Sequence, residues 1–168
     1  MKRLDSIIPQ KILADFQKFV DDYAGKEFLQ ELTLLLCDRF NISYALIGYL
    51  SKDPGIITSA AMIANGLEYK EFSYNLKGTP CEDVVGKNSC FFPAGVQAMF
   101  PEDKELEMLK VESYYGSPLV CPSGKPLGLI ALMDTKKINN GSLINQTLAI
   151  ITPRTEKELS NLLNRIRD

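Results

Sequence analysis

Apolar residues recur at helical spacing near the start of the chain. The first stripe consists of Ile12, Phe16, Phe19 and Tyr23. Gly25 follows this stripe, and glycine is common just beyond the end of a helix. A second stripe with the same spacing runs over residues 28–40. The pattern therefore predicts two consecutive helices.

The pattern changes at residue 43, where β-branched and aromatic residues become frequent. Residues 43–50 are rich in strand-forming residues and end at the turn sequence Ser-Lys-Asp-Pro-Gly. Residues 56–64 and 68–74 have the composition of two further strands, separated by Asn65-Gly66. Parallel strands need a long crossover connection, so these short turns predict three antiparallel strands.

Residues 75–112 form a longer connection that mixes prolines and glycines with apolar residues. Its sequence predicts short helices, and long structured connections often carry ligand sites. Thr79, Pro80 and Glu82 have the pattern of a helix start with a capping box. Asp103 precedes another short helix, and we interpret the acidic run that begins at Glu102 as its solvated face.

The remaining pattern predicts a hairpin and a long helix. Residues 113–121 and 126–134 flank a loop that contains glycine, and the second of these strands is apolar on both faces, as expected at the centre of a sheet. Apolar residues from Ile144 to Ile166 recur at steps of four and three, which predicts a helix that Pro153 kinks or breaks. The order of elements predicts an α+β fold: an antiparallel sheet of about five to six strands with N- and C-terminal helices on one face.

Composition excludes several classes of chemistry. The chain has 168 residues, the size of one domain, and contains no histidine. Without histidine there is no Ser-His or Cys-His catalytic pair, no HExxH zinc helix and no His-ligated haem. The formal net charge is −2 and no basic run is longer than two residues, so we expect no nucleic-acid partner.

Neither membrane insertion nor secretion is expected. The longest apolar run, residues 127–133, is far shorter than the ~20 residues of a membrane-spanning helix. The basic residues Lys2 and Arg3 are not followed by the continuous apolar core of a secretory signal. We therefore expect a cytoplasmic protein.

The four cysteines leave two interpretations open. Cys37, Cys81, Cys90 and Cys121 form no CxxC pair, so we expect no metal site. Cys81 lies in the first turn of a predicted helix, where backbone amides lower the pKa of a thiol, and Cys90 is a possible redox partner. The other interpretation is that these cysteines are small buried apolar residues.

Several segments, taken in order, resemble a GAF domain, the sensory module that is common in bacterial signalling proteins and binds small molecules. The similarity covers about residues 26–164. It is carried by Tyr74–Cys81 (YNLKGTPC), Val84, Gly86, Cys90, Phe92-Pro93, Val96, Phe100-Pro101, Asp103, Glu112–Leu119 (ESYYGSPL), Gly124–Gly128 (GKPLG) and Glu156–Leu159 (EKEL).

The resemblance implies an N-terminal helix over residues 1–25 and a single GAF domain over residues 26–168 that includes the C-terminal helix. It implies that the connection crosses the second face of the sheet and closes a ligand pocket there. It also implies that the terminal helices pair in a homodimer and pass a signal to a fused or separate output domain.

The ligand and cofactor stay unassigned. GAF domains that bind cyclic nucleotides carry an NKFDE signature, and this chain contains no Asp-Glu dipeptide. GAF domains that bind bilins use a cysteine beside a histidine, and there is no histidine here. We take as candidate ligand-binding residues the aromatic and polar side chains near the predicted pocket, although aromatic residues on strands are commonly core. They are Tyr44, Tyr74, Thr79, Cys81, Phe92, Glu112, Ser113 and Tyr114.

Two functional hypotheses follow. The first is a non-catalytic GAF-type sensory domain in signal transduction, with an unidentified small-molecule ligand. The alternative is a thiol-based redox sensor, or an enzyme similar to the free methionine sulfoxide reductases, that uses Cys81 with Cys90 or Cys121.

Overall fold

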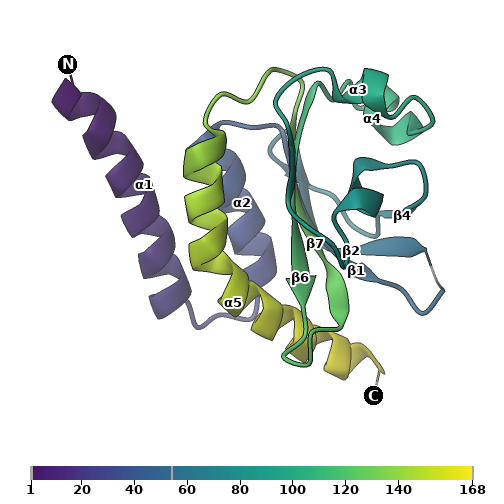
Figure 1. Cartoon of the computed structure of the whole chain (residues 1–168). Coiled ribbons are helices and arrows are strands. Elements are labelled where there is room, and N and C mark those ends of the chain that lie inside the picture. Colours follow the sequence, from purple (N-terminus) through teal and green to yellow (C-terminus); the bar gives the residue numbers. More distant parts are fainter. Residues whose placement is uncertain (1, 54, 168) are drawn as a thin grey trace.

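Three layers make up the molecule in this computed structural model, which describes the backbone of residues 2–53 and 55–167 and the side chains of residues 8–53 and 55–166. The helices α2 (Phe28–Phe40) and α5 (Gly141–Arg167) cover one face of a sheet, and α1 (Lys2–Asp22) packs on the outer side of these helices (Figure 1). A segment with short helices covers the other face (Figure 1). The predicted α+β arrangement is confirmed.

The sheet is antiparallel and has seven strands in the described part of the chain. Its order is β3-β2-β1-β7-β6-β5, and β4 pairs with the same strand, β2, as β3 does. The central position of β7 between β1 and β6 agrees with its two apolar faces. The strands are β1 (Tyr44–Leu50), β2 (Ile56–Ala64), β3 (Leu67–Glu68), β4 (Ser73–Asn75), β5 (Cys90–Phe92), β6 (Ser113–Val120) and β7 (Pro126–Asp134).

Two strand predictions were incomplete. The expected strand over residues 68–74 is divided into β3 and β4, because Glu71 has a φ of 56°, which no extended strand allows. The sequence pattern also missed β5, which pairs with the outer edge of β6. A strand of three residues has too little periodicity to be recognised, and its structure depends on the partner strand.

The crossing segment between β4 and β6 contains η1 (Pro80–Asp83), α3 (Val96–Met99) and α4 (Lys104–Met108). The predicted capping box is wrong: η1 is a 3₁₀ turn, and the Thr79 hydroxyl donates to the carbonyl of Leu76 at 2.6 Å instead of capping it. The predicted cap of α4 is confirmed, because Asp103 accepts a hydrogen bond from the amide of Leu106 at 3.2 Å.

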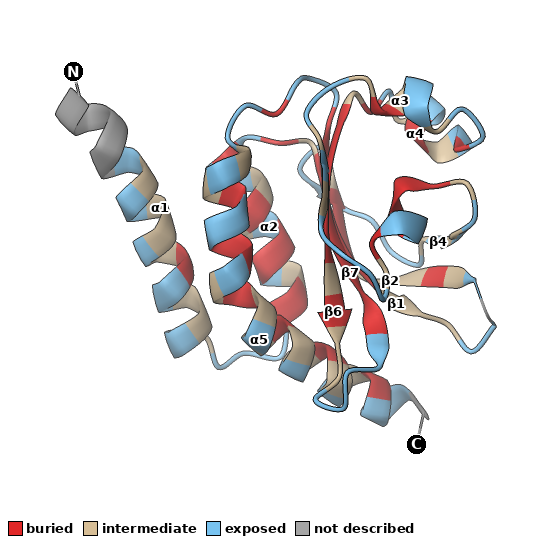
Figure 2. Cartoon of the chain, viewed as in Figure 1, coloured by how far each residue is buried: buried red, intermediate tan, exposed pale blue. Residues whose placement is uncertain are grey.

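The sheet separates two apolar cores, and Figure 2 shows buried residues on both of its sides. Successive side chains of a strand point to opposite faces, so β7 contributes to both. Ile130 and Leu132 face the helices, whereas Leu129, Ala131 and Met133 face the crossing segment. A displacement of β7 therefore moves side chains in both cores.

The helix α1 packs on α2 and α5 of the same chain. Phe16 is fully buried and its ring stacks on Phe40 with the centroids 5.9 Å apart; burying such a side chain contributes roughly 2 kcal/mol. Arg154 on α5 donates to the backbone carbonyls of Val20 and Tyr23 at 2.6 and 2.7 Å. The apolar stripe of α1 thus has partners within the chain.

The helix α5 continues through Pro153 to Arg167, and its axis changes direction along its length (Figure 1). Proline lacks an amide donor and its ring crowds the preceding turn, which bends a helix. None of the described helices combines the length and the hydropathy that crossing a membrane requires.

Candidate ligand pocket

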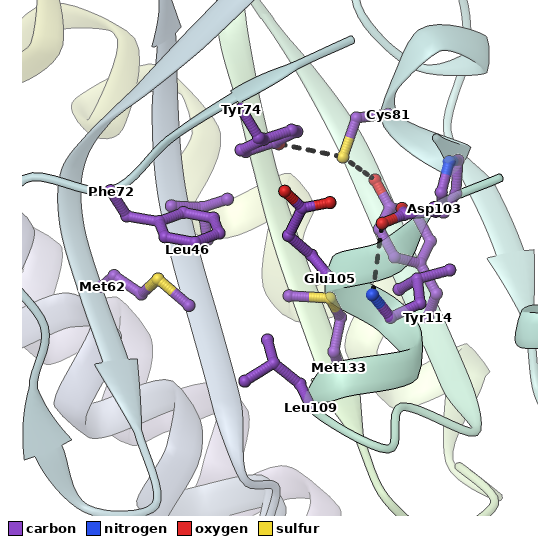
Figure 3. Close-up of a pocket in the computed structure, with 12 residues that line it drawn as sticks. Leu46, Met62, Phe72, Tyr74, Cys81, Asp103, Glu105, Leu109, Tyr114 and Met133 are labelled. Atoms are coloured by element: carbon purple, nitrogen blue, oxygen red, sulfur yellow. Dashed lines mark hydrogen bonds between the residues drawn. The ribbon is translucent and has the colours of Figure 1, made fainter. Parts of the chain in front are cut away.

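A cavity of about 30 Å³ lies between the sheet and the crossing segment. Strands β1, β2, β6 and β7 supply its floor, and the side chains of η1 and α4 close it from above (Figure 3). The lining residues are Leu46, Met62, Phe72, Tyr74, Pro80, Cys81, Asp103, Glu105, Leu106, Leu109, Tyr114 and Met133. The walls are mostly apolar and aromatic, with a few polar groups that converge on one side.

Tyr74, Cys81 and Tyr114 form a hydrogen-bonded chain along one wall (Figure 3). The hydroxyl of Tyr74 donates to Sγ of Cys81 at 3.1 Å, and Sγ lies 3.0 Å from the hydroxyl of Tyr114. Gly116 makes room for this arrangement, because a Cβ there would lie 2.5 Å from the Tyr114 hydroxyl oxygen. These hydrogen bonds join β4, η1 and β6 along the cavity wall.

The burial of Cys81 agrees with the interpretation as a small buried residue rather than with that of an activated thiol. Burial raises the pKa of Cys81 to about 11, and the hydrogen bonds from Tyr114 and Tyr74 offset only part of that effect. The short 3₁₀ turn does not provide the helix N-terminus that the prediction assumed. At neutral pH the side chain is therefore a protonated thiol.

The sequence suggested that the acidic run is a solvated helix face, but two of its residues are not fully exposed to solvent. Asp103 is only 8% exposed and Glu105 is half-buried, and both line the cavity. Figure 3 shows the Glu105 carboxylate pointing into the space between Tyr74 and Asp103. Burial, together with the neighbouring Glu105 carboxyl, raises the pKa of Asp103 to about 6. Glu102 and Glu107 are exposed, as predicted.

Three of the eight candidate ligand-binding residues line this cavity: Tyr74, Cys81 and Tyr114. Tyr44 is buried in the same core, but its hydroxyl is occupied by the carbonyl of Leu109 at 2.9 Å. Phe92 packs on Tyr114 behind the cavity wall, with their ring centroids 6.3 Å apart. Thr79 is buried beside η1 and donates to the Leu76 carbonyl, as described above.

Glu112 and Ser113 do not reach the cavity. The carboxylate of Glu112 accepts a hydrogen bond from the amide of Gly95 at 2.7 Å and so anchors the start of α3. The hydroxyl of Ser113 is fully buried and donates to the carbonyl of Lys136. Glu112 therefore joins two parts of the crossing segment, and Ser113 joins the start of β6 to the loop that follows β7.

Sequence reasoning missed most of the remaining lining residues. Leu46, Met62 and Met133 carry no signal that separates a cavity wall from ordinary core. Asp103 carried a signal, because its role as a helix cap was recognised, but its burial depends on where the crossing segment packs. The tertiary structure brings β2, β7 and α4 together, and local sequence patterns do not show this.

The other three cysteines, Cys37, Cys90 and Cys121, are half-buried. All four are free thiols, and the described residues contain no cluster of Cys, Asp and Glu suited to a metal ion. Sγ of Cys90 lies 3.6 Å from the carbonyl oxygen of Asp83. Burial raises the pKa of Cys37 to about 12, and that of Cys90 also rises.

A curated signalling protein is similar in sequence to this chain. Hybrid signal transduction histidine kinase F from Dictyostelium discoideum is 29% identical over 131 residues, which cover 78% of this chain and 11% of that protein. The chain thus matches about a tenth of the length of this relative. No model of a protein family matches the sequence.

Solved structures resemble the whole fold. The GAF domain of an Acinetobacter phosphoenolpyruvate-protein phosphotransferase superposes with a TM-score of 0.71 at 10% identity and covers 95% of this chain and 98% of that one. Free methionine-R-sulfoxide reductase from Neisseria meningitidis, solved in complex with its substrate, gives 0.70 at 12% identity and covers 90% and 88%. Together with the three layers, the strand order and the motifs, these similarities establish that the chain has the GAF fold.

Proposed function

We propose that this chain is a non-catalytic GAF-type sensory domain that binds a small molecule in the cavity described above. The observation that carries the proposal is the cavity itself, which lies between the sheet and the crossing segment and has mostly apolar walls with a few polar groups. The name of the histidine kinase relative supports a role in signal transduction and a fused output domain.

The proposal requires the crossing segment to move. A volume of about 30 Å³ accommodates a group of one or two water molecules in size, whereas sites for small molecules usually span roughly 300–1,000 Å³. Two hydrogen bonds hold the end of the segment over the sheet: the Tyr44 hydroxyl donates to the Leu109 carbonyl at 2.9 Å, and the Glu112 amide donates to the Asp134 carbonyl at 2.9 Å. A ligand changes this balance only by its greater affinity for the open arrangement.

Strand β6 offers a route from the cavity to the helices. Tyr114 faces the cavity, and its neighbour Tyr115 faces α5, where its hydroxyl donates to the side chain of Asn145 at 3.1 Å. At the other end of β6, the amide of Val120 donates to the carboxylate of Glu156 on α5 at 2.6 Å. We infer that a shift of Tyr114 on ligand binding moves β6 and, through these two contacts, α5.

The absence of catalysis is part of the proposal, since a methionine sulfoxide reductase shares the fold. The burial and the raised pKa of Cys81 support it. Turnover of free methionine sulfoxide with a dithiol reductant, compared between the unmodified protein and Cys81→Ala, tests it. Turnover that is lost in the variant would establish the thiol enzyme instead.

Homodimerisation through the terminal helices and a cytoplasmic location also remain proposals. Exposed apolar residues on the helix layer, Ile8 and Leu34, support a partner surface there. The four free thiols fit a reducing compartment. Light scattering at several protein concentrations tests the dimer, and a monomer throughout would remove it.

A thermal-shift screen against a panel of metabolites tests ligand binding. We expect hits that raise the melting temperature of the unmodified protein but not that of Leu109→Phe, whose larger side chain fills the cavity. The matched control is Leu67→Phe, at an exposed position on β3. Hits that are equally effective on both variants, or no hits at all, would contradict the proposal.

A further inference from the structure

The charge in the cavity has one sign. Asp103 and Glu105 line it, and its other lining side chains include no lysine or arginine. Among the residues that the structure describes, ion pairs involve Arg39 and Arg154, both on the helix layer and remote from the cavity. Asp103 is buried and accepts one hydrogen bond, from the Leu106 amide, and neither it nor the half-buried Glu105 has a positively charged partner in the described part of the chain. A carboxylate in such a place is costly, so this pair of carboxyl groups favours a positive charge in the cavity.

The remaining walls indicate what kind of cation fits. Phe72, Tyr74 and Tyr114 present aromatic rings, and Leu46 and Met62 complete an apolar surface. A hydrated metal ion needs oxygen ligands on most sides, which these walls do not offer. An organic ammonium group attached to an apolar body matches these walls. The carboxylates pair with its positive charge, and the aromatic rings contact both the cation and the hydrocarbon part.

We propose that the cavity receives the ammonium group of a small organic amine and that Asp103 and Glu105 are its counter-ions. This inference rests on the proposed function, because it assigns a ligand class to the same cavity. Anions such as phosphate esters, nucleotides and carboxylic acids are disfavoured, since every ionised group that lines the cavity would repel them.

Protons compete with the amine. The titratable groups that face Asp103 are Glu105 on its own helix, Tyr74 on β4, Cys81 in η1 and Tyr114 on β6. Burial raises the pKa of both tyrosines and of the cysteine, so these three stay neutral near pH 6, where Asp103 titrates. Below about pH 6 the Asp103 carboxyl is protonated, and an amine must displace that proton in order to bind.

The probes are benzylamine, benzyl alcohol and benzoate, which have similar size and carry positive, zero and negative charge. Calorimetric titration at pH 7.5 is expected to give benzylamine at least about tenfold tighter binding than the alcohol and no binding of benzoate. Lowering the pH to 5 is expected to weaken benzylamine binding about tenfold, because a carboxyl with a pKa of about 6 is then mostly protonated.

Three variants localise the effect. Asp103→Asn keeps a residue that can cap α4, and Glu105→Gln is isosteric; each is expected to weaken benzylamine binding at least about tenfold. Glu107→Gln, on the same short helix but exposed, is the matched control and leaves binding unchanged. The pH series on the unmodified protein supplies the same test if a variant fails to fold.

The outcomes separate this inference from the proposed function. Equal affinity for the three probes, tighter binding of benzoate, or amine binding that survives both Asp103→Asn and Glu105→Gln would overturn the amine inference. The cavity remains a ligand site in those cases if the metabolite hits are lost in Leu109→Phe. Absence of every hit, probes included, overturns both.

Discussion

Replacing Arg154 by methionine removes the side chain that joins α1 to α5. Its guanidinium donates to the carbonyls of Val20 and Tyr23 at 2.6 and 2.7 Å, which lie at the C-terminal end of α1. It also pairs with Glu158 at 2.9 Å and lies 4.5 Å from the centroid of the Phe28 ring. One partly buried residue therefore connects three helices.

The magnitude follows from these four contacts. The two hydrogen bonds from a charged donor contribute about 1 kcal/mol each at a site that is one-quarter exposed. The ion pair within the helix adds about 0.3–0.5 kcal/mol and the cation–π contact about 0.5–1 kcal/mol. Methionine retains part of the packing and adds little to this loss, so we expect Arg154→Met to lower the free energy of unfolding by about 3 kcal/mol.

Urea unfolding followed by circular dichroism measures this loss, and amide hydrogen exchange locates it. Exchange is expected to accelerate in α1 before the rest of the chain. The control is Arg39→Met, which removes an exposed pair with Asp15 between α2 and α1 and is expected to cost less than about 0.5 kcal/mol. Equal losses for the two variants, or unchanged exchange in α1, would refute the role of Arg154.

Three further predictions concern the cavity. Gly116→Ala places a Cβ against the Tyr114 hydroxyl and is expected to cost about 1–3 kcal/mol in a urea melt; a neutral effect would show that the wall relaxes freely. Maleimide labelling of Cys81 below pH 9, followed by mass spectrometry, is expected to be at least about a hundredfold slower in the folded protein than in urea. The reason is that burial raises the pKa of the thiol from 9.0 to about 11. Comparable labelling rates would contradict the burial of this thiol. The pKa of Asp103 is higher in the folded than in the unfolded state, so the folded state binds the proton first as the pH falls, and stability rises from about pH 6 to about pH 4. Asp103→Asn removes this contribution, and identical pH profiles for the two proteins would show that Asp103 is not buried as described.

Much of the fold was predictable because its elements are long and periodic. The stripe of residues 28–40 coincides with α2, and β7 was recognised as central from its two apolar faces. The three-residue strand β5 was not predictable, since pairing with β6 stabilises it and local propensity does not. The strand break at Glu71 was not predictable, because glycine or asparagine usually marks a left-handed backbone and this residue is a glutamate.

The site was predictable only in part. Tyr74, Cys81 and Tyr114 were chosen from separate motifs, and the topology brings all three together. Glu105 was assigned to a solvated face, because sequence shows that a helix is acidic but not which side of it packs on the sheet. The burial of Cys81 depends on residues distant in the sequence, which no local motif records.

The sharing of β7 between the two cores has a consequence for cooperativity. Neither core can lose its packing alone, because Leu129 and Met133 on one face and Ile130 and Leu132 on the other belong to one hydrogen-bonded strand. We therefore expect the sheet, the helices α2 and α5 and the cavity to unfold in a single transition. Any molecule that binds the cavity then raises the melting temperature of the whole domain, by an amount set by its concentration and its affinity.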